Sequence, residues 1–199
     1  VYNKINQGSI WNYNGVAGEP GGVWAWGGNE YGSLGQNDTI DRSSPVQVLG
    51  GSFLKPIGGY LAANNASAGG VNTSGELWLL GYNAHGQLAQ NDTTTRSSPV
   101  QVPGTWAYAY GVGGTSSVAM SGVKSNGELY TWGSNHTGFL GHSNQTQYSS
   151  PTQVPGAFLT SAGSFTTTAM SGTAVSAWIK SDNTLMMCGS NNNGALGQS

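Results

Sequence analysis

Leu77-Trp78-Leu79-Leu80-Gly81 is the most informative segment of this chain for its fold, because three other segments repeat it. The repeats are Val23-Trp24-Ala25-Trp26-Gly27, Leu129-Tyr130-Thr131-Trp132-Gly133 and Leu185-Met186-Met187-Cys188-Gly189. Their closing glycines follow one another at intervals of 54, 52 and 56 residues. Self-similarity at an interval of this size indicates a repeat architecture.

Two further markers keep a fixed place in the units. Ser-Ser-Pro ends 18 residues after the closing glycine in three units, and between them lies a Leu-Gly pair, or Leu88-Ala89 in the second unit. The residues assigned to the structural repeat are Trp26, Gly27, Gly35, Pro45, Trp78, Gly81, Pro99, Trp132, Gly133, Gly141, Pro151, Gly189 and Gly197. Markers that hold their spacing through successive copies predict one structural unit per copy.

Each unit is predicted to contain short strands. In the stretch 77–80 both sets of alternating positions are apolar, which predicts a strand buried on both faces. A glycine ends this strand, a turn and a polar loop follow, and Val100-Gln101-Val102 and its equivalents alternate like outer strands. We place the proline of each Ser-Ser-Pro at the start of the outer strand, where its missing N–H does least harm.

Units of about 52–56 residues with about four short strands predict an all-β fold of β-propeller blades. They span about 1–50, 51–104, 105–156 and 157–199, within a single repeat domain. A linear β-solenoid is the alternative, although its repeats are normally shorter. The fourth unit is incomplete, because its proline would fall beyond Ser199. We therefore expect a larger propeller, or an oligomer in which a neighbouring subunit completes the blade.

Charged residues are scarce. They form 7% of the chain, against about a quarter of a typical globular sequence, and the net charge is −2. Six scattered cations do not make the phosphate-neutralising surface that a nucleic-acid binder needs. No apolar run is long enough to span a bilayer. We predict no nucleic-acid partner and no membrane insertion, and we expect Cys188, the only cysteine, to fill a small buried apolar site.

The Leu-Trp-x-x-Gly, Asn-x-x-Gly-x-Leu-Gly and Ser-Ser-Pro-x-x-Val markers resemble those of the regulator of chromosome condensation repeat family, over nearly the whole chain. The Asn-Asp-Thr and Arg-Ser-Ser-Pro-Val-Gln segments are most similar to bacterial and phage versions. The resemblance implies a propeller, typically of seven blades. The founding member is a nucleotide exchange factor for a small nuclear GTPase and docks on chromatin. Those roles depend on loops and a basic tail that have no match here.

The turns after the buried strands carry the candidate binding residues. Because these turns recur at fixed spacing, they should share one rim of the propeller, where aromatic and amide side chains would suit a protein or glycan. The predicted contacts are Tyr31, Asn83, His85, Asn135 and His136. A metal or acid/base pair of the two histidines is the chemical alternative, and turn polarity alone is the structural one.

Asp and Arg recur four residues apart in the polar loops, as Asp38 with Arg42 and Asp92 with Arg96. This spacing predicts a local ion pair or an Asx-turn, whereas calcium would need more convergent carboxylates. The sequence shows no catalytic constellation, no phosphate loop and no zinc-ligand spacing. We predict no enzyme activity, no catalytic residue, no metal and no cofactor.

Two functions follow from these observations. The first is a structural or binding module of an extracellular or virion appendage, such as a phage tail fibre, that engages a protein or a glycan. The low charge, the Asn/Ser/Thr/Gly-rich composition and the incomplete fourth unit favour it. The alternative is a soluble propeller that inhibits or regulates one protein partner, including a nucleotide-exchange role that the charge balance disfavours.

Overall fold

A computed structural model of the chain describes residues 11–13, 21–58, 67–114, 117–159, 165–170, 173–191 and 194–197. Throughout this part the protein is all-β, and its strands pair antiparallel, which confirms the predicted class. The strands are β1 (Trp11–Tyr13), β2 (Gly21–Gly27), β3 (Arg42–Gly58), β4 (Ser67–Asn72), β5 (Leu77–Gly81), β6 (Arg96–Val102), β7 (Trp106–Gly114), β8 (Ser117–Lys124), β9 (Leu129–Gly133), β10 (Tyr148–Val154), β11 (Phe165–Met170), β12 (Thr173–Ile179) and β13 (Leu185–Gly189).

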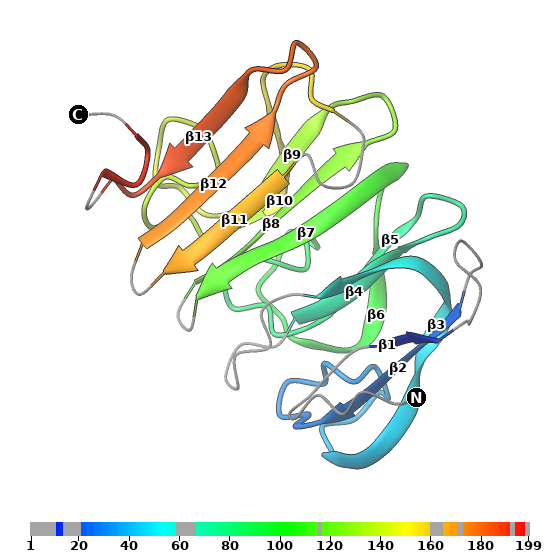
Figure 1. Cartoon of the computed structure of the whole chain (residues 1–199). Helices are drawn as coiled ribbons and strands as arrows, with labels where there is room; N and C mark the ends of the chain where they lie inside the picture. The colour runs from blue at the N-terminus through cyan, green and yellow to red at the C-terminus, as the bar shows by residue number, and fades with distance from the viewer. Residues whose placement is uncertain are drawn as a thin grey trace.

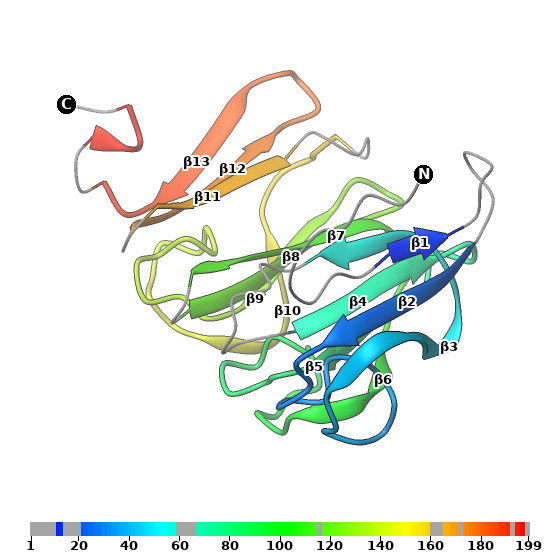
Figure 2. The same ribbon diagram turned by 60° about the horizontal axis from the view of Figure 1, so that its bottom comes forward.

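The strands form successive propeller blades. Blade 1 holds β1, β2 and the first part of β3. Blade 2 holds the rest of β3 with β4, β5 and β6, and blade 3 is the sheet β7–β8–β9–β10. Blade 4 is the three-stranded sheet β11–β12–β13. Figure 1 and Figure 2 show the sheets in this order, with β1 and β2 at one end and β13 at the other.

Strand β3 joins the first two blades without a break. Its residues 42–53 pair with β2 and its residues 53–58 pair with β4. The predicted boundary at residue 50 therefore lies inside one strand. In the later units Gly104 and Gly156 follow a proline at this point and take positive φ angles of 120° and 126°. The first unit has Leu49-Gly50 instead, so no proline interrupts the strand.

The predicted position of the prolines is wrong by three residues. Strand β6 begins at Arg96, and its pairing with β5 shifts between Val100 and Arg96, so Ser97-Ser98-Pro99 form a bulge. The same shift occurs in β3 and β10. A bulge leaves residues out of the hydrogen-bond ladder, so it accommodates a proline inside a strand.

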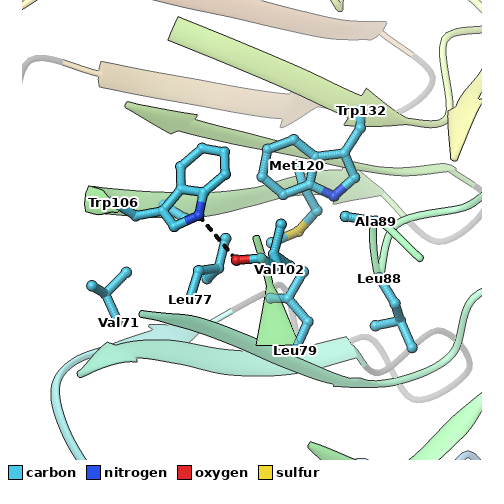
Figure 3. Close-up of a cluster of buried hydrophobic side chains, with 10 residues drawn as sticks. Val71, Leu77, Leu79, Leu88, Ala89, Val102, Trp106, Met120 and Trp132 are labelled. Atoms are coloured by element: carbon cyan, nitrogen blue, oxygen red, sulfur yellow. Dashed lines mark hydrogen bonds between the residues drawn. The ribbon is translucent and has the colours of Figure 1, made fainter. Parts of the chain in front are cut away.

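The core lies between adjacent blades. In Figure 3, Leu77 and Leu79 of blade 2 lie in one cluster with Trp106 and Trp132 of blade 3. The indole N–H of Trp106 donates to the carbonyl oxygen of Val102 at 3.3 Å. Each of these five residues is at most 2% exposed. A strand with two apolar faces is therefore explained by two neighbouring blades, one on each side.

The faces of the inner strand are used in the same way wherever two described blades meet. The first and third residues of the repeated stretch pack on the following blade, as Leu77 and Leu79 do. The second and fourth pack on the preceding blade, as Trp78 and Leu80 do against Val23 of blade 1. Cys188, in the fourth position, packs on blade 3 and donates to the Phe139 carbonyl at 3.2 Å. It is half-buried, and burial raises the pKa of its thiol to about 12.

No helix in the described ranges is long and apolar enough to cross a membrane.

A candidate protein-binding rim

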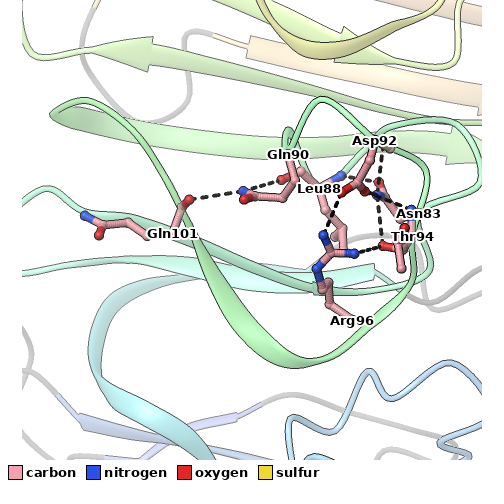
Figure 4. Close-up of polar contacts among 7 residues, drawn as sticks. All are labelled: Asn83, Leu88, Gln90, Asp92, Thr94, Arg96 and Gln101. Carbon is pink, nitrogen blue, oxygen red and sulfur yellow. Dashed lines mark hydrogen bonds and ion pairs between the residues drawn. The ribbon is translucent and has the colours of Figure 1, made fainter.

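A buried asparagine organises the turn after the inner strand in blades 1, 2 and 3, as Figure 4 shows for Asn83. The side-chain amide of Asn83 donates to the carbonyl oxygens of Asp92 and Thr94, at 3.1 and 3.0 Å. Its Oδ1 accepts from the backbone N–H of Leu88 at 2.8 Å. These bonds tie the turn to the polar loop nine to eleven residues later.

The bond between the leucine N–H and the asparagine Oδ1 recurs in the other units. The N–H groups of Leu34, Leu140 and Leu196 donate to Asn29, Asn135 and Asn191, at 2.9, 3.0 and 3.0 Å. Asn83 and Asn135 are fully buried. Both side-chain amides are hydrogen-bonded to the polar loop and to the backbone of the turn, so they support the rim from beneath its surface.

The recurring Asp and Arg form an ion pair, and the Asp also forms an Asx-turn, which are the two arrangements predicted from the sequence. Arg96 Nη2 lies 2.7 Å from Asp92 Oδ2, and the Thr94 N–H donates to Asp92 Oδ1 at 2.8 Å, which closes an Asx-turn. Asp38 and Arg42 repeat this at 2.6 Å. The backbone N–H, and then the arginine, lower the pKa of both carboxyls. These ion pairs stabilise the same polar loop to which the buried asparagine is hydrogen-bonded.

A ladder of aromatic rings crosses three blades on the surface of these turns. We call Tyr31, Tyr82, His85 and His136 the rim ladder. Tyr31 of blade 1 and Tyr82 of blade 2 have ring centroids 4.8 Å apart, Tyr82 and His85 are 6.2 Å apart, and His85 meets His136 of blade 3 at 5.7 Å. All three contacts are edge-on, a favourable geometry for aromatic pairs. His85 and His136 therefore do share one rim.

The rim ladder keeps polar groups in reach of a partner. His136 is exposed, and the other three rings are half-buried. His85 Nδ1 lies 3.0 Å from Oε1 of Gln147 in blade 3. Desolvation, and then Glu30, raise the pKa of Tyr31 above its ordinary value of 10.0. Such a surface offers ring edges and hydrogen-bond donors side by side.

Sequence reasoning missed Tyr82 and Gln147. Tyr82 directly follows the closing Gly81, where the other units have glycine or serine, so the repeat alignment places it on this rim. Gln147 had no such signal, because it reaches His85 from the loop of another blade.

The third histidine is part of the structure of blade 3. His142 Nε2 lies 2.9 Å from Thr131 Oγ1, whose hydroxyl donates to the Leu140 carbonyl at 2.7 Å. A hydroxyl has one proton, so Nε2 carries the hydrogen of this contact. Burial lowers the pKa of His142. In the described ranges no three metal-ligating side chains converge.

A hollow of about 350 Å³ lies at the other end of β5, away from the rim ladder. Thr73, Ser74, Thr105, Trp106 and Ser125 are among the residues that line it.

Comparisons with known proteins agree with this architecture. The Regulator of chromosome condensation (RCC1) repeat matches residues 20–57 and 126–170. The ultraviolet-B receptor UVR8 of Arabidopsis thaliana is 29% identical over 68% of this chain, and the probable E3 ubiquitin-protein ligase HERC4 of Homo sapiens is 35% identical over 45% of it. These matches span 30% and 8% of the two relatives.

Two solved structures share the fold. Human WBSCR16 superposes with a TM-score of 0.61 and 19% identity, over 84% of this chain and 42% of that one. Yeast RCC1 (Prp20), solved with Kap60 bound, superposes with a TM-score of 0.62 and 14% identity, over 85% of this chain and 40% of that one. The chain thus spans less than half the length of each.

The chain is therefore an array of β-propeller blades, in which residues 20–57 and 126–170 match the RCC1 repeat.

Proposed function

We propose that the chain is a protein-binding module of a receptor or regulator, and that the rim ladder is its contact surface. One observation carries the proposal: four aromatic side chains from three blades lie in continuous ring contact on one rim. Tyrosine and other aromatic side chains are enriched where proteins bind one another, because they bury a large area and lose little conformational entropy.

The turns beneath the rim ladder make it a preorganised surface. Each ring stands on a turn whose asparagine is buried and fully bonded, so binding would order few additional groups. The module is proposed to act by binding alone. His142 and the two Asp–Arg pairs are engaged in the structure of their own blades.

The comparisons support the regulator alternative over the appendage. UVR8 is named a receptor, and yeast RCC1 was solved with another protein bound. The appendage function, with its extracellular or virion location, rests on composition alone and stays a prediction. The low charge supports the proposal that nucleic acid is not the partner.

A peptide library displayed on phage tests the proposal, with the immobilised chain as bait. Selected peptides are expected to bind the chain, and to lose at least about tenfold in affinity when Tyr82→Ala removes the central ring, as for a hot-spot aromatic. Ser125→Ala, in the hollow at the other end of β5, is the matched control and should bind as well as the unchanged chain.

Three results would overturn the proposal: peptides that bind Tyr82→Ala as well as the unchanged chain, peptides that depend on Ser125 instead, or no enrichment at all. The same variants probed on a glycan array and with duplex DNA separate the other partner classes. Ladder-dependent binding to either of those would replace a protein partner with a glycan or a nucleic acid.

A further inference from the structure

One aromatic site within the chain already holds a cation. The rings of Trp106 and Tyr130 meet edge-on, with centroids 5.8 Å apart and planes at 76°. Lys124 Nζ lies over both rings, 4.2 Å from the Tyr130 centroid and 5.8 Å from that of Trp106. The Tyr130 hydroxyl donates to the Glu128 carboxylate at 3.1 Å. We call Trp106, Tyr130 and Glu128, with Lys124 between them, the filled aromatic site.

Two kinds of group attract the ammonium of the filled aromatic site. The face of an aromatic ring is negative, so a cation placed over it is stabilised. The carboxylate adds a full negative charge: hydrogen bonds from Asn126 and Tyr130, and then the charge of Lys124, lower the pKa of Glu128. Two rings set edge-on with a carboxylate beside a tyrosine hydroxyl therefore form a cation site in this protein.

The rim has the same combination of groups without a cation. Tyr31 and Tyr82 meet edge-on at 65°, with centroids 4.8 Å apart. Glu30 directly precedes Tyr31, and desolvation, followed by this carboxylate, raises the pKa of the Tyr31 hydroxyl. Glu30 is exposed, and both rings are half-buried. Among the described residues the cation–π contacts are those of Lys124. We call Tyr31, Tyr82 and Glu30 the open aromatic site.

The charge around the open aromatic site is negative. Asp41 accepts from the backbone N–H of Asn29, the residue before Glu30, at 2.8 Å. Both arginines of this end are bound to aspartates of their own loops. The lysines of the described ranges belong to the opposite end of the strands, near the end of β4 or at the hairpins that follow β8 and β12: Lys55, Lys124 and Lys180. Within these ranges, no cation of the rim is left to neutralise Glu30 and Asp41.

We propose that the open aromatic site takes a cationic side chain of the partner, a lysine or an arginine. Its ammonium or guanidinium group would lie on the faces of Tyr31 and Tyr82, beside the Glu30 carboxylate. Lys124 occupies the filled aromatic site in the same way. The inference rests on the proposed function, because it names the chemistry of the partner that the rim ladder would contact.

A basic segment of a protein fits the surroundings of the open aromatic site better than a free amine does. The rim ladder continues from Tyr82 to His85 and His136, so residues that flank the cation would also find rings to contact. A negative rim speeds the encounter with a basic segment and repels phosphate groups. The partner expected here is therefore a protein segment that presents an exposed lysine or arginine.

Nuclear magnetic resonance titration of the 199-residue chain tests the inference. The probes are two blocked tripeptides, acetyl-Gly-Lys-Gly-amide and acetyl-Gly-Arg-Gly-amide. Each should give saturable shifts of the backbone N–H signals of Glu30, Tyr31 and Tyr82. Peptides with Nε-acetyl-lysine or citrulline in the middle keep the shape and lose the charge, so they should give no saturable shift. High salt should weaken both cationic peptides, because ions screen exposed charges.

Variants assign the binding to the open aromatic site. Glu30→Gln and Tyr82→Ala each remove one exposed contribution, so each should weaken the cationic peptides by about threefold to fivefold. Glu128→Gln is the matched control, because it changes the carboxylate beside the other tyrosine, where Lys124 already occupies the site. It should bind the peptides as tightly as the unchanged chain. If Tyr82→Ala fails to fold, Tyr31→Leu replaces it with the same expectation.

Three results would overturn the inference. The first is neutral peptides that bind as tightly as the cationic ones. The second is a Glu30→Gln variant that binds the cations like the unchanged chain. The third is the absence of a saturable shift with either cationic peptide at millimolar concentration.

The phage selection separates this inference from the proposed function. Selected peptides that need Tyr82 but carry no lysine or arginine, and that bind Glu30→Gln unchanged, would keep the protein-binding rim and overturn the cationic partner. Cation binding at the open aromatic site with no selected peptide would instead overturn the proposed function and leave the cation site in place.

Discussion

The backbone N–H of Asn91 donates a 2.8 Å hydrogen bond to the carbonyl oxygen of Ser149, in the following blade. Asn37 donates to Ser97 in the same way at 2.9 Å. Both asparagines adopt positive φ, at 59° and 60°, and both accept from a serine hydroxyl of the bulge through Oδ1. The Ser-Ser-Pro bulge is therefore a clasp between neighbouring blades.

Gly86→Ala should weaken this clasp. Gly86 has a φ of 77°, and an added Cβ would meet the Ser149 backbone, so we expect a loss of about 2–4 kcal/mol in the free energy of unfolding. Gly194→Ala is the matched control, with a φ of 69° and open space, and it should lose only about 1 kcal/mol. Urea unfolding of the dilute chain measures both, and equal losses would show that Ser149 does not restrict Gly86.

Asn83→Ala should destabilise the chain without acting on a partner directly. It removes the amide that binds two carbonyls and leaves the buried Leu88 N–H without its acceptor. We expect a loss of about 2–4 kcal/mol in chemical denaturation. His136→Ala, at an exposed rim position, should change stability by less than about 0.5 kcal/mol. A mild effect of Asn83→Ala would contradict the structural role assigned to it.

The Asp38 and Asp92 carboxyls should make stability sensitive to acid. Their pKa values in the folded chain lie below the ordinary 3.8, so their contribution is present above that pH and is lost as the pH falls through the folded pKa values. The thermal midpoint of the Asp38→Asn/Asp92→Asn variant should fall less steeply below pH 3.8. Asn144, which closes the same turn with Thr146 at 2.9 Å, indicates that the asparagines keep the loop folded. An unchanged slope would mean that other carboxyls dominate.

His142→Gln should remove a pH dependence nearer neutrality. Burial holds the pKa of His142 below its ordinary 6.5, so the folded chain is fully stable above that pH and loses stability as the pH falls below it. Glutamine stands at this place in the first two units, where Gln90 Nε2 donates to the Leu88 and Gln101 carbonyls, so the substitution should fit. Thermal midpoints between about pH 7 and 5 measure the slope, and a persistent slope would assign it to other groups.

Much of the fold could be predicted from the sequence, because each repeat of the sequence corresponds to one structural unit. The inner strands end at the repeated glycines, as predicted, and these glycines adopt positive φ angles of 108°, 98°, 95° and 123°. The Asp–Arg loops and the shared rim of His85 and His136 followed from sequence spacing in the same way. The burial of Asn83 and Asn135 could not be predicted, because an amide in a polar turn has the same sequence pattern whether it faces solvent or the backbone. Only the hydrogen-bond geometry separates the two cases.

The all-β class, the number of units and the strands buried on both faces could be read from the amino-acid order, because those properties depend on the spacing of residues along the chain. The tertiary structure alone decided which blade covers which face, that Ser-Ser-Pro clasps the preceding blade, and that Tyr82 and Gln147 belong to the rim. These contacts join residues tens of positions apart, such as His85 and Gln147. Their partners are chosen by the packing of one blade on the next, which no local pattern records.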